Sequence, residues 1–112
     1  MIRLAILQIL ITSISLANNN HPIILVHGFL GWGKEEVGDK SYWGGENDIE
    51  KYLNDRGYQV YSVSLGPVSS TYDCAIETFY QIKGGQVDYG QEHSERYKII
   101  RKPEGKIYEG LY

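Results

Sequence analysis

A short apolar run that leads directly into a glycine-rich segment is the feature that most constrains the fold. Residues 22–26 (Pro-Ile-Ile-Leu-Val) lack polar alternation and are rich in β-branched side chains, which is typical of a strand buried on both faces. Residues 28–45 then contain six glycines, two tryptophans and one phenylalanine. This composition is too irregular for a helix or strand, and loops of this length are usually functional or disordered.

A helix and a second strand are predicted after this loop. Asn47 can cap a helix over residues 48–56, and Gly57 can end that helix in a left-handed conformation. Residues 58–65 have the β-branched and aromatic content of a strand, which Gly66 ends.

The second predicted helix extends to about Lys83, where Gly84 and Gly85 end it. Its candidate N-caps are three hydroxyl residues: Ser69, Ser70 and Thr71. Four apolar residues share one face of this helix: Ala75, Ile76, Phe79 and Ile82. Beyond residue 85 we predict loop with one short helical turn.

The order strand, loop, helix, strand, helix predicts an α/β fold. Parallel strands need a crossover connection, and a helix usually supplies it. We therefore expect a parallel sheet with crossover helices. A chain of 112 residues is long enough for one small domain and too short for two.

The first seventeen residues differ in character from the rest. Arg3 supplies one positive charge, residues 4–16 are largely apolar, and Ser15-Leu16-Ala17 places small residues where signal peptidase cleaves. We predict a signal peptide at 1–17 and a secreted domain at 18–112. The alternative is a membrane anchor, but the apolar stretch is shorter than the roughly 18–20 residues that span a bilayer, so no transmembrane segment is expected after cleavage.

Charge and cysteine content narrow the function classes. The net charge is −3, and eleven Lys and Arg are scattered among fourteen Asp and Glu. Without a basic cluster the chain offers no footprint for nucleic acid. Cys74 is the only cysteine, so an intramolecular disulfide is excluded.

The turn His27-Gly28-Phe29 follows the first predicted strand. Ligands of open α/β sheets bind beyond the carboxyl ends of strands. In serine esterases and lipases, a backbone N–H of such a turn holds the oxyanion of a tetrahedral intermediate. Alternatively, the tripeptide simply turns the chain at a strand end, and the three residues alone leave both interpretations open.

A longer set of motifs carries a specific resemblance. The motifs run in this order: HGFxGWG, YWGG, DIExxLN, GYxxY, GPxSSxxD and GGxVDYGxxH. Together they cover nearly all of residues 21–97, which resemble the amino-terminal part of secreted bacterial triacylglycerol lipases of the staphylococcal and thermophilic Bacillus type. The resemblance implies a truncated α/β-hydrolase sheet and hydrolysis of carboxylic esters, chiefly acylglycerols, at a lipid interface.

The resemblance also implies roles for individual residues. Phe29 matches the oxyanion-hole residue, with its main-chain N–H as the donor. Asp73 and His93 match two of the four ligands of a structural zinc ion. The position of a third ligand is Ile99 here, and the fourth lies beyond this sequence, so the zinc site is expected to be incomplete and no other cofactor is implied. Without the resemblance, Asp73 would be a helix-start acid and His93 a surface histidine.

The catalytic triad is missing from this sequence. None of its 112 residues forms the G-x-S-x-G elbow that presents the nucleophile in this fold, and the acid and the base follow that elbow. The resemblance makes His27 a hydrogen-bonded turn residue, not a base. We therefore expect a secreted lipase fragment that is inactive alone, or alternatively a catalytically inactive, secreted lipid- or ester-binding protein.

Overall fold

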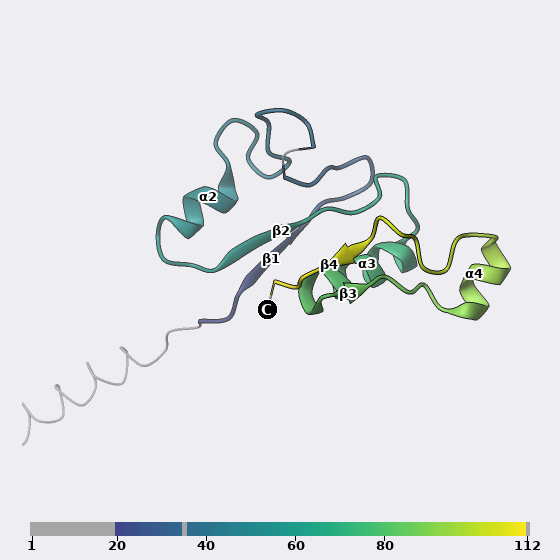
Figure 1. Ribbon diagram of the computed structural model, residues 1–112. Coiled ribbons are helices and arrows are strands. Elements are labelled where there is room, and N and C mark those ends of the chain that lie inside the picture. The colour runs from purple at the N-terminus through teal and green to yellow at the C-terminus, as the bar shows by residue number, and fades with distance from the viewer. Residues whose placement is uncertain (1–19, 35, 112) are drawn as a thin grey trace, which may run out of the picture.

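Two parallel strands with a helix between them form the first half of the fold. The computed structural model describes residues 20–34 and 36–111, so the predicted signal peptide lies outside the described residues. Strand β1 (Ile23–Val26) pairs in parallel with β2 (Val60–Val63). Helix α2 (Ile49–Asn54) lies between them in the chain, and it stands to the left of the strand pair in Figure 1. The predicted parallel pairing is confirmed.

The second half surrounds a longer helix. Helix α3 (Thr71–Lys83) is followed by β3 (Gly85–Gln86), α4 (Gln91–Tyr97) and β4 (Ile107–Tyr108). Strands β3 and β4 pair antiparallel and lie beside α3, to the right of β1 and β2 in Figure 1. The short helical turn predicted in this region is α4, whereas the strand pair was not predicted. In the described part of the chain, no helix combines the length and apolar character needed to cross a membrane.

The helix caps agree with the sequence in one case and differ in the other. Ser70 caps α3, and its hydroxyl accepts the N–H of Asp73 at 3.1 Å, as predicted. The N-cap of α2 is Asp48, whose carboxylate accepts the N–H of Lys51 at 3.0 Å, so the prediction of Asn47 is wrong. The two candidates are neighbours with similar side chains, and sequence places element ends only approximately.

The apolar core is formed by β2 and by residues that follow β2 and β3, and it includes no residue of β1. Its members are Val60, Val63, Leu65, Val87 and Tyr89. In β1, Ile23 is 38% exposed and Val26 is 43% exposed, so the prediction that this strand is buried on both faces is wrong. The physical reason is that β1 pairs only with β2 among the described residues, whereas the residue that follows β2 also contacts Gln81 of α3.

The buried face of α3 is polar. Its buried residues are Glu77 and Gln81, whereas Phe79, on the apolar face, is 54% exposed. The side-chain amide of Gln81 donates to the carbonyl of Ser64 at 2.6 Å and accepts its N–H at 2.9 Å. Gln81 thus pairs with the backbone just beyond β2 as a neighbouring strand would, and this contact ties α3 to the sheet.

We predict that Gln81→Leu lowers the free energy of unfolding by about 1–3 kcal/mol, because it leaves two partly buried backbone groups of Ser64 without partners. Urea denaturation measures the change. The matched control is Gln91→Leu on the exposed side of α4, for which a change within about 0.5 kcal/mol is expected. Equal effects of the two substitutions would contradict the strand-like role of Gln81.

Candidate functional site

A buried histidine joins the loops that follow β1 and β2. His27 is 6% exposed, and its Nε2 accepts the N–H of Leu65 at 2.9 Å. Its Nδ1 lies 3.0 Å from the carbonyl oxygen of Gly28. Because Nε2 accepts, Nδ1 carries the proton and donates it to that oxygen. Both ring nitrogens are therefore occupied, which confirms that His27 is a hydrogen-bonded turn residue and cannot serve as a base.

Phe29 offers a backbone donor that its neighbours do not. In the described part of the chain, its N–H donates no hydrogen bond to the protein. An unpaired amide at a strand end can bind an anionic oxygen. The surrounding amides are all engaged: Gly28 with Tyr42 Oη at 3.3 Å, Leu30 with the carbonyl of Pro67 at 2.8 Å, and Gly31 with the carbonyl of Gly28 at 2.9 Å.

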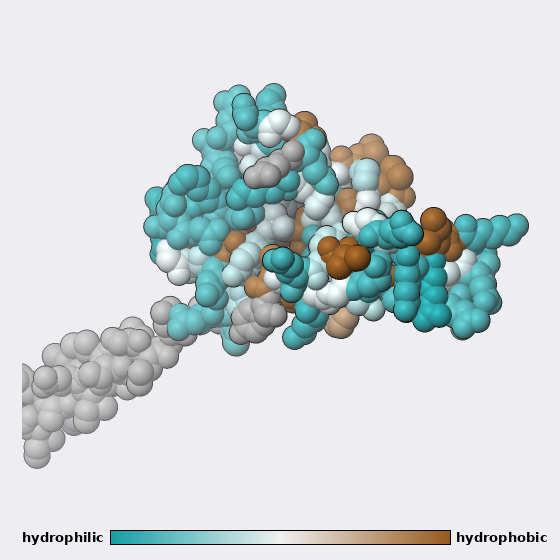
Figure 2. Space-filling view, in the orientation of Figure 1, coloured by the Kyte–Doolittle hydropathy of each residue, from teal (hydrophilic) through white to brown (hydrophobic). Residues whose placement is uncertain are grey.

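An open cleft of about 330 Å³ lies between the two loops. Phe29 is 77% exposed beside it, and Leu30 and Val68 are also exposed. Figure 2 shows the resulting apolar surface at the upper right, over the loops after β1 and β2. The cleft is lined from both loops and from the start of α3, chiefly by His27, Gly28, Phe29, Leu65, Pro67 and Cys74.

The glycines of the first loop make room for the protein's own atoms. A Cβ on Gly31 would lie 2.6 Å from Nδ1 of His27, and a Cβ on Gly33 would overlap the side chain of Ser64. A Cβ on Gly28 would meet only Tyr42 Oη, at an ordinary 3.4 Å. Gly31 and Gly33 are therefore required for the loop to fold back over both strand ends.

The serine hydroxyls have structural partners. Ser64 donates to Glu36, and Ser94 donates to the carbonyl of Gly90 at 2.7 Å. Ser70 caps α3. These three hydroxyls therefore have structural roles.

The structure brings Asp73 and His93 together. Oδ1 of Asp73 lies 2.8 Å from Nε2 of His93 although the residues are twenty positions apart. The imidazole also stacks on Tyr72, with 4.0 Å between ring centroids, and Tyr97 lies at 4.8 Å. The pair links the start of α3 to α4.

Two ligands do not complete a structural zinc site, which needs four. No group of three or more His, Cys, Asp and Glu side chains gathers anywhere in residues 20–34 and 36–111. Asp73 and His93 instead satisfy each other by a direct hydrogen bond. The described residues therefore do not fit the zinc ion that the resemblance implies.

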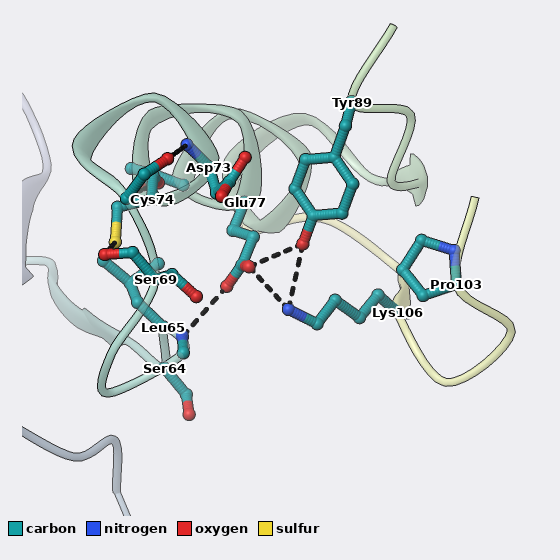
Figure 3. A network of polar contacts seen from close by, with 12 residues as sticks. Ser64, Leu65, Ser69, Asp73, Cys74, Glu77, Tyr89, Pro103 and Lys106 are labelled. Carbon is teal, nitrogen blue, oxygen red and sulfur yellow. Dashed lines mark hydrogen bonds and ion pairs between the residues drawn. The ribbon is translucent and has the colours of Figure 1, made fainter. Parts of the chain in front are cut away.

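Sequence reasoning missed a buried polar cluster around Glu77. Glu77 is 1% exposed, and Figure 3 shows Tyr89 and Lys106 pointing toward its carboxylate. Oε1 accepts from Tyr89 Oη at 2.6 Å and from Lys106 Nζ at 2.5 Å. Oε2 accepts the N–H of Gly66 at 3.1 Å. The one available signal was the spacing of Glu77 and Gln81, which puts both polar residues on one helix face.

The ionisation of this cluster follows from its burial. Burial, together with the hydrogen bond to Glu77, raises the pKa of Tyr89 to about 12. Burial opposes the charge of Lys106, but hydrogen bonds to Glu77 and Tyr89 outweigh it and raise the pKa of the amine to about 12. At neutral pH the tyrosine is therefore protonated and the lysine charged, as donors to a carboxylate must be.

Comparison with known proteins places this geometry among lipases. Residues 19–112 match the family described as "Lipase-like, C-terminal domain". The chain is similar to a lipase of Staphylococcus epidermidis, 45% identical over 98 residues, which are 84% of this chain and 14% of the relative. Among solved structures, lipase 1 from Pelosinus fermentans matches with a TM-score of 0.80 and 48% identity over 85% of this chain and 24% of that one. For Staphylococcus hyicus lipase the TM-score is 0.77 and the identity 38%, over 84% and 24% of the two chains.

We predict that His27→Leu lowers the free energy of unfolding by about 1–3 kcal/mol, because the buried N–H of Leu65 loses its acceptor. Thermal or urea unfolding measures the loss. The control is His21→Leu, at an exposed position before β1, for which a smaller effect is expected. Equal stability of His27→Leu and the unmodified chain would refute the bridging role of His27.

We predict that added Zn²⁺ shifts the melting temperature by no more than roughly 1 °C, because tight binding to the folded state would raise it by several degrees. Differential scanning fluorimetry with and without the ion tests this. His93→Ala is the control, and its response to Zn²⁺ should equal that of the unmodified chain. A shift of several degrees that disappears in His93→Ala would show that the two ligands suffice.

Proposed function

Because the chain belongs to the lipase-like C-terminal domain family, we propose that it forms the oxyanion-binding part of an ester hydrolase with an α/β-hydrolase fold. The observation that carries this proposal is the unpaired N–H of Phe29 at the carboxyl end of β1, beside an open cleft. A parallel strand pair with a crossover helix is consistent with such a sheet.

The proposed role is electrostatic. When a serine attacks an ester carbonyl, negative charge develops on the carbonyl oxygen, and a preorganised N–H stabilises that charge more in the transition state than in the substrate. Phe29 supplies one donor, and the residue after the nucleophile supplies another in this fold. The chain spans only 14% of the curated relative and contains no serine elbow. The serine, the acid and the base therefore come from residues outside this sequence.

The proposed substrates are acylglycerols and related apolar esters. Phe29 lines the cleft, and the exposed Leu30 and Val68 lie next to cleft-lining residues in the two loops. Exposed apolar side chains of this kind suit an acyl chain or a lipid surface. A secreted location is proposed from the apolar residues before Ala17, with residues 18–112 as the secreted part. Zinc has no part in this proposal.

A second candidate is a secreted protein that binds lipids or esters without cleaving them. It is favoured by the combination of an open cleft with a sequence that lacks a G-x-S-x-G motif. In this case Phe29 would contribute mainly its ring, and the N–H would have no oxyanion to bind.

We predict that the N–H of residue 29, and not the ring, matters for catalysis. The test is a chimeric enzyme in which this chain replaces the matching segment of the Staphylococcus epidermidis lipase, so that the relative supplies the missing residues. Phe29→Pro removes the N–H and should lower kcat by about 10²–10³-fold. The matched variant Phe29→Leu keeps the N–H and should retain most of kcat. Equal losses in the two variants would contradict the oxyanion role.

The unmodified 112-residue chain separates the two candidates without a chimera. We expect no turnover of p-nitrophenyl butyrate above background. In a titration with butylphosphonate, a tetrahedral anion, the NMR signal of the Phe29 amide should move further than those of Gly28, Leu30 and Gly31. Binding of tributyrin together with an unmoved Phe29 amide would favour the binding protein instead.

A further inference from the structure

The carboxylate of Glu77 is placed where it stabilises little by itself. It is almost fully buried with a single cation, Lys106. Desolvation of a buried ion pair offsets most of the attraction between its charges, and apolar side chains of similar volume often give equal stability. The burial of Glu77 therefore calls for a reason other than stability, and its second oxygen provides one.

That second oxygen holds the loop after β2. Oε2 of Glu77 accepts the N–H of Gly66 at 3.1 Å. The next residue, Pro67, accepts the N–H of Leu30 through its carbonyl at 2.8 Å. Leu30 directly follows Phe29 and has a left-handed backbone with a φ of 58°, a conformation that non-glycine residues adopt only when their surroundings hold them. A short series of contacts thus connects Glu77 to the Phe29–Leu30 peptide, which directly follows the peptide that carries the unpaired amide.

Two distant segments hold Glu77 in turn. Tyr89 follows β3 and Lys106 precedes β4, and both donate to Oε1. Lys106 also donates to Tyr89 Oη at 3.0 Å, so each of the three groups contacts the other two. Figure 3 shows Glu77 between these two residues and the loop after β2.

We propose that Glu77 is a positioning residue that orients the amide of Phe29 through the backbone of Gly66 and Pro67. It touches no substrate. Its carboxylate group, held by Tyr89 and Lys106, sets where the loop after β2 lies, and that loop sets the conformation of Leu30. The inference rests on the proposed function in one respect, which is that the Phe29 amide binds an oxyanion.

The test compares hydrogen exchange of single amides in four variants of the 112-residue chain. Glu77→Gln keeps an acceptor oxygen for Gly66. Glu77→Met combined with Lys106→Met removes that acceptor without leaving a buried charge unpaired. Glu77→Asp keeps the charge but withdraws it by one methylene. Tyr89→Phe loses two hydrogen bonds of the network, those with Glu77 and Lys106, and leaves the contact with Gly66 in place.

The Leu30 and Gly66 amides should exchange at least about tenfold faster in the double variant. The exchange rate of the Ile23 amide serves as the reference. Ile23 begins β1, far from the Phe29 loop, and its N–H donates to the carbonyl of Gln59. Glu77→Asp should show a smaller effect in the same direction, and it replaces the double variant if that one does not fold. Tyr89→Phe should leave the ratio of Leu30 to Ile23 exchange unchanged. Glu77→Gln, whose single amide oxygen cannot accept from both Gly66 and Lys106, should raise that ratio less than the double variant does.

Two results would overturn the proposal. One is wild-type protection of Leu30 in both the double variant and Glu77→Asp. The other is equal acceleration of Leu30 and Ile23, which would make Glu77 a residue of general stability. In the chimeric enzyme, the double variant and Glu77→Asp should lower kcat and leave KM nearly unchanged. If Leu30 exchanges faster in the Glu77 variants but kcat of the chimeric enzyme is unchanged both in them and in Phe29→Pro, the positioning role is upheld and the oxyanion function is refuted.

Discussion

The hydrogen bond from Leu65 to His27 is the contact on which the rest of the site depends. It joins the carboxyl ends of the two parallel strands, where backbone groups leave the ladder and must find other partners. By accepting one N–H and donating to the carbonyl of Gly28, the ring fixes both loops at once. The tight approach of Gly31 to the same ring then folds the first loop back over the strand ends. An apolar side chain would fill this volume but could not pair these groups.

Polar contacts, more than apolar ones, hold the helix and the loops around β2. Gln81 pairs with the backbone of Ser64, and Glu77 pairs with that of Gly66. Such contacts are directional, so each sets a position as well as contributing stability. Val60 and Val63 of β2 belong to the apolar core together with Val87 and Tyr89, and the buried polar groups of α3 hold the residues that follow β2 against that helix. A small domain with few fully buried apolar residues needs such polar contacts because its apolar core alone contributes little stability.

Sequence was informative where a local pattern determines the structure. The apolar run before His27 gave β1, Ser70 marked the start of α3, and the alternation of elements gave the parallel pairing. Prediction from sequence failed where the structure of a residue depends on partners that are distant in the chain. Strands β3 and β4 have two residues each, too few to show a pattern. Glu77 lies inside because Gly66, Tyr89 and Lys106 surround it, and the apolar stripe of α3 gave no indication of this. Likewise, the contact between Asp73 and His93 was implied by resemblance and not by spacing.

The conformation of the Phe29 loop is a property of the whole chain. The left-handed conformation of Leu30 makes the loop less stable than an ordinary turn, so the loop depends on other contacts to hold it. Those contacts come from the end of β2, from α3 and, through Glu77, from segments on both sides of α4. A substitution near Lys106 therefore reaches the amide of residue 29 although the two are far apart in sequence. In this fold the geometry of the Phe29 loop therefore depends on the packing of the β3–β4 pair.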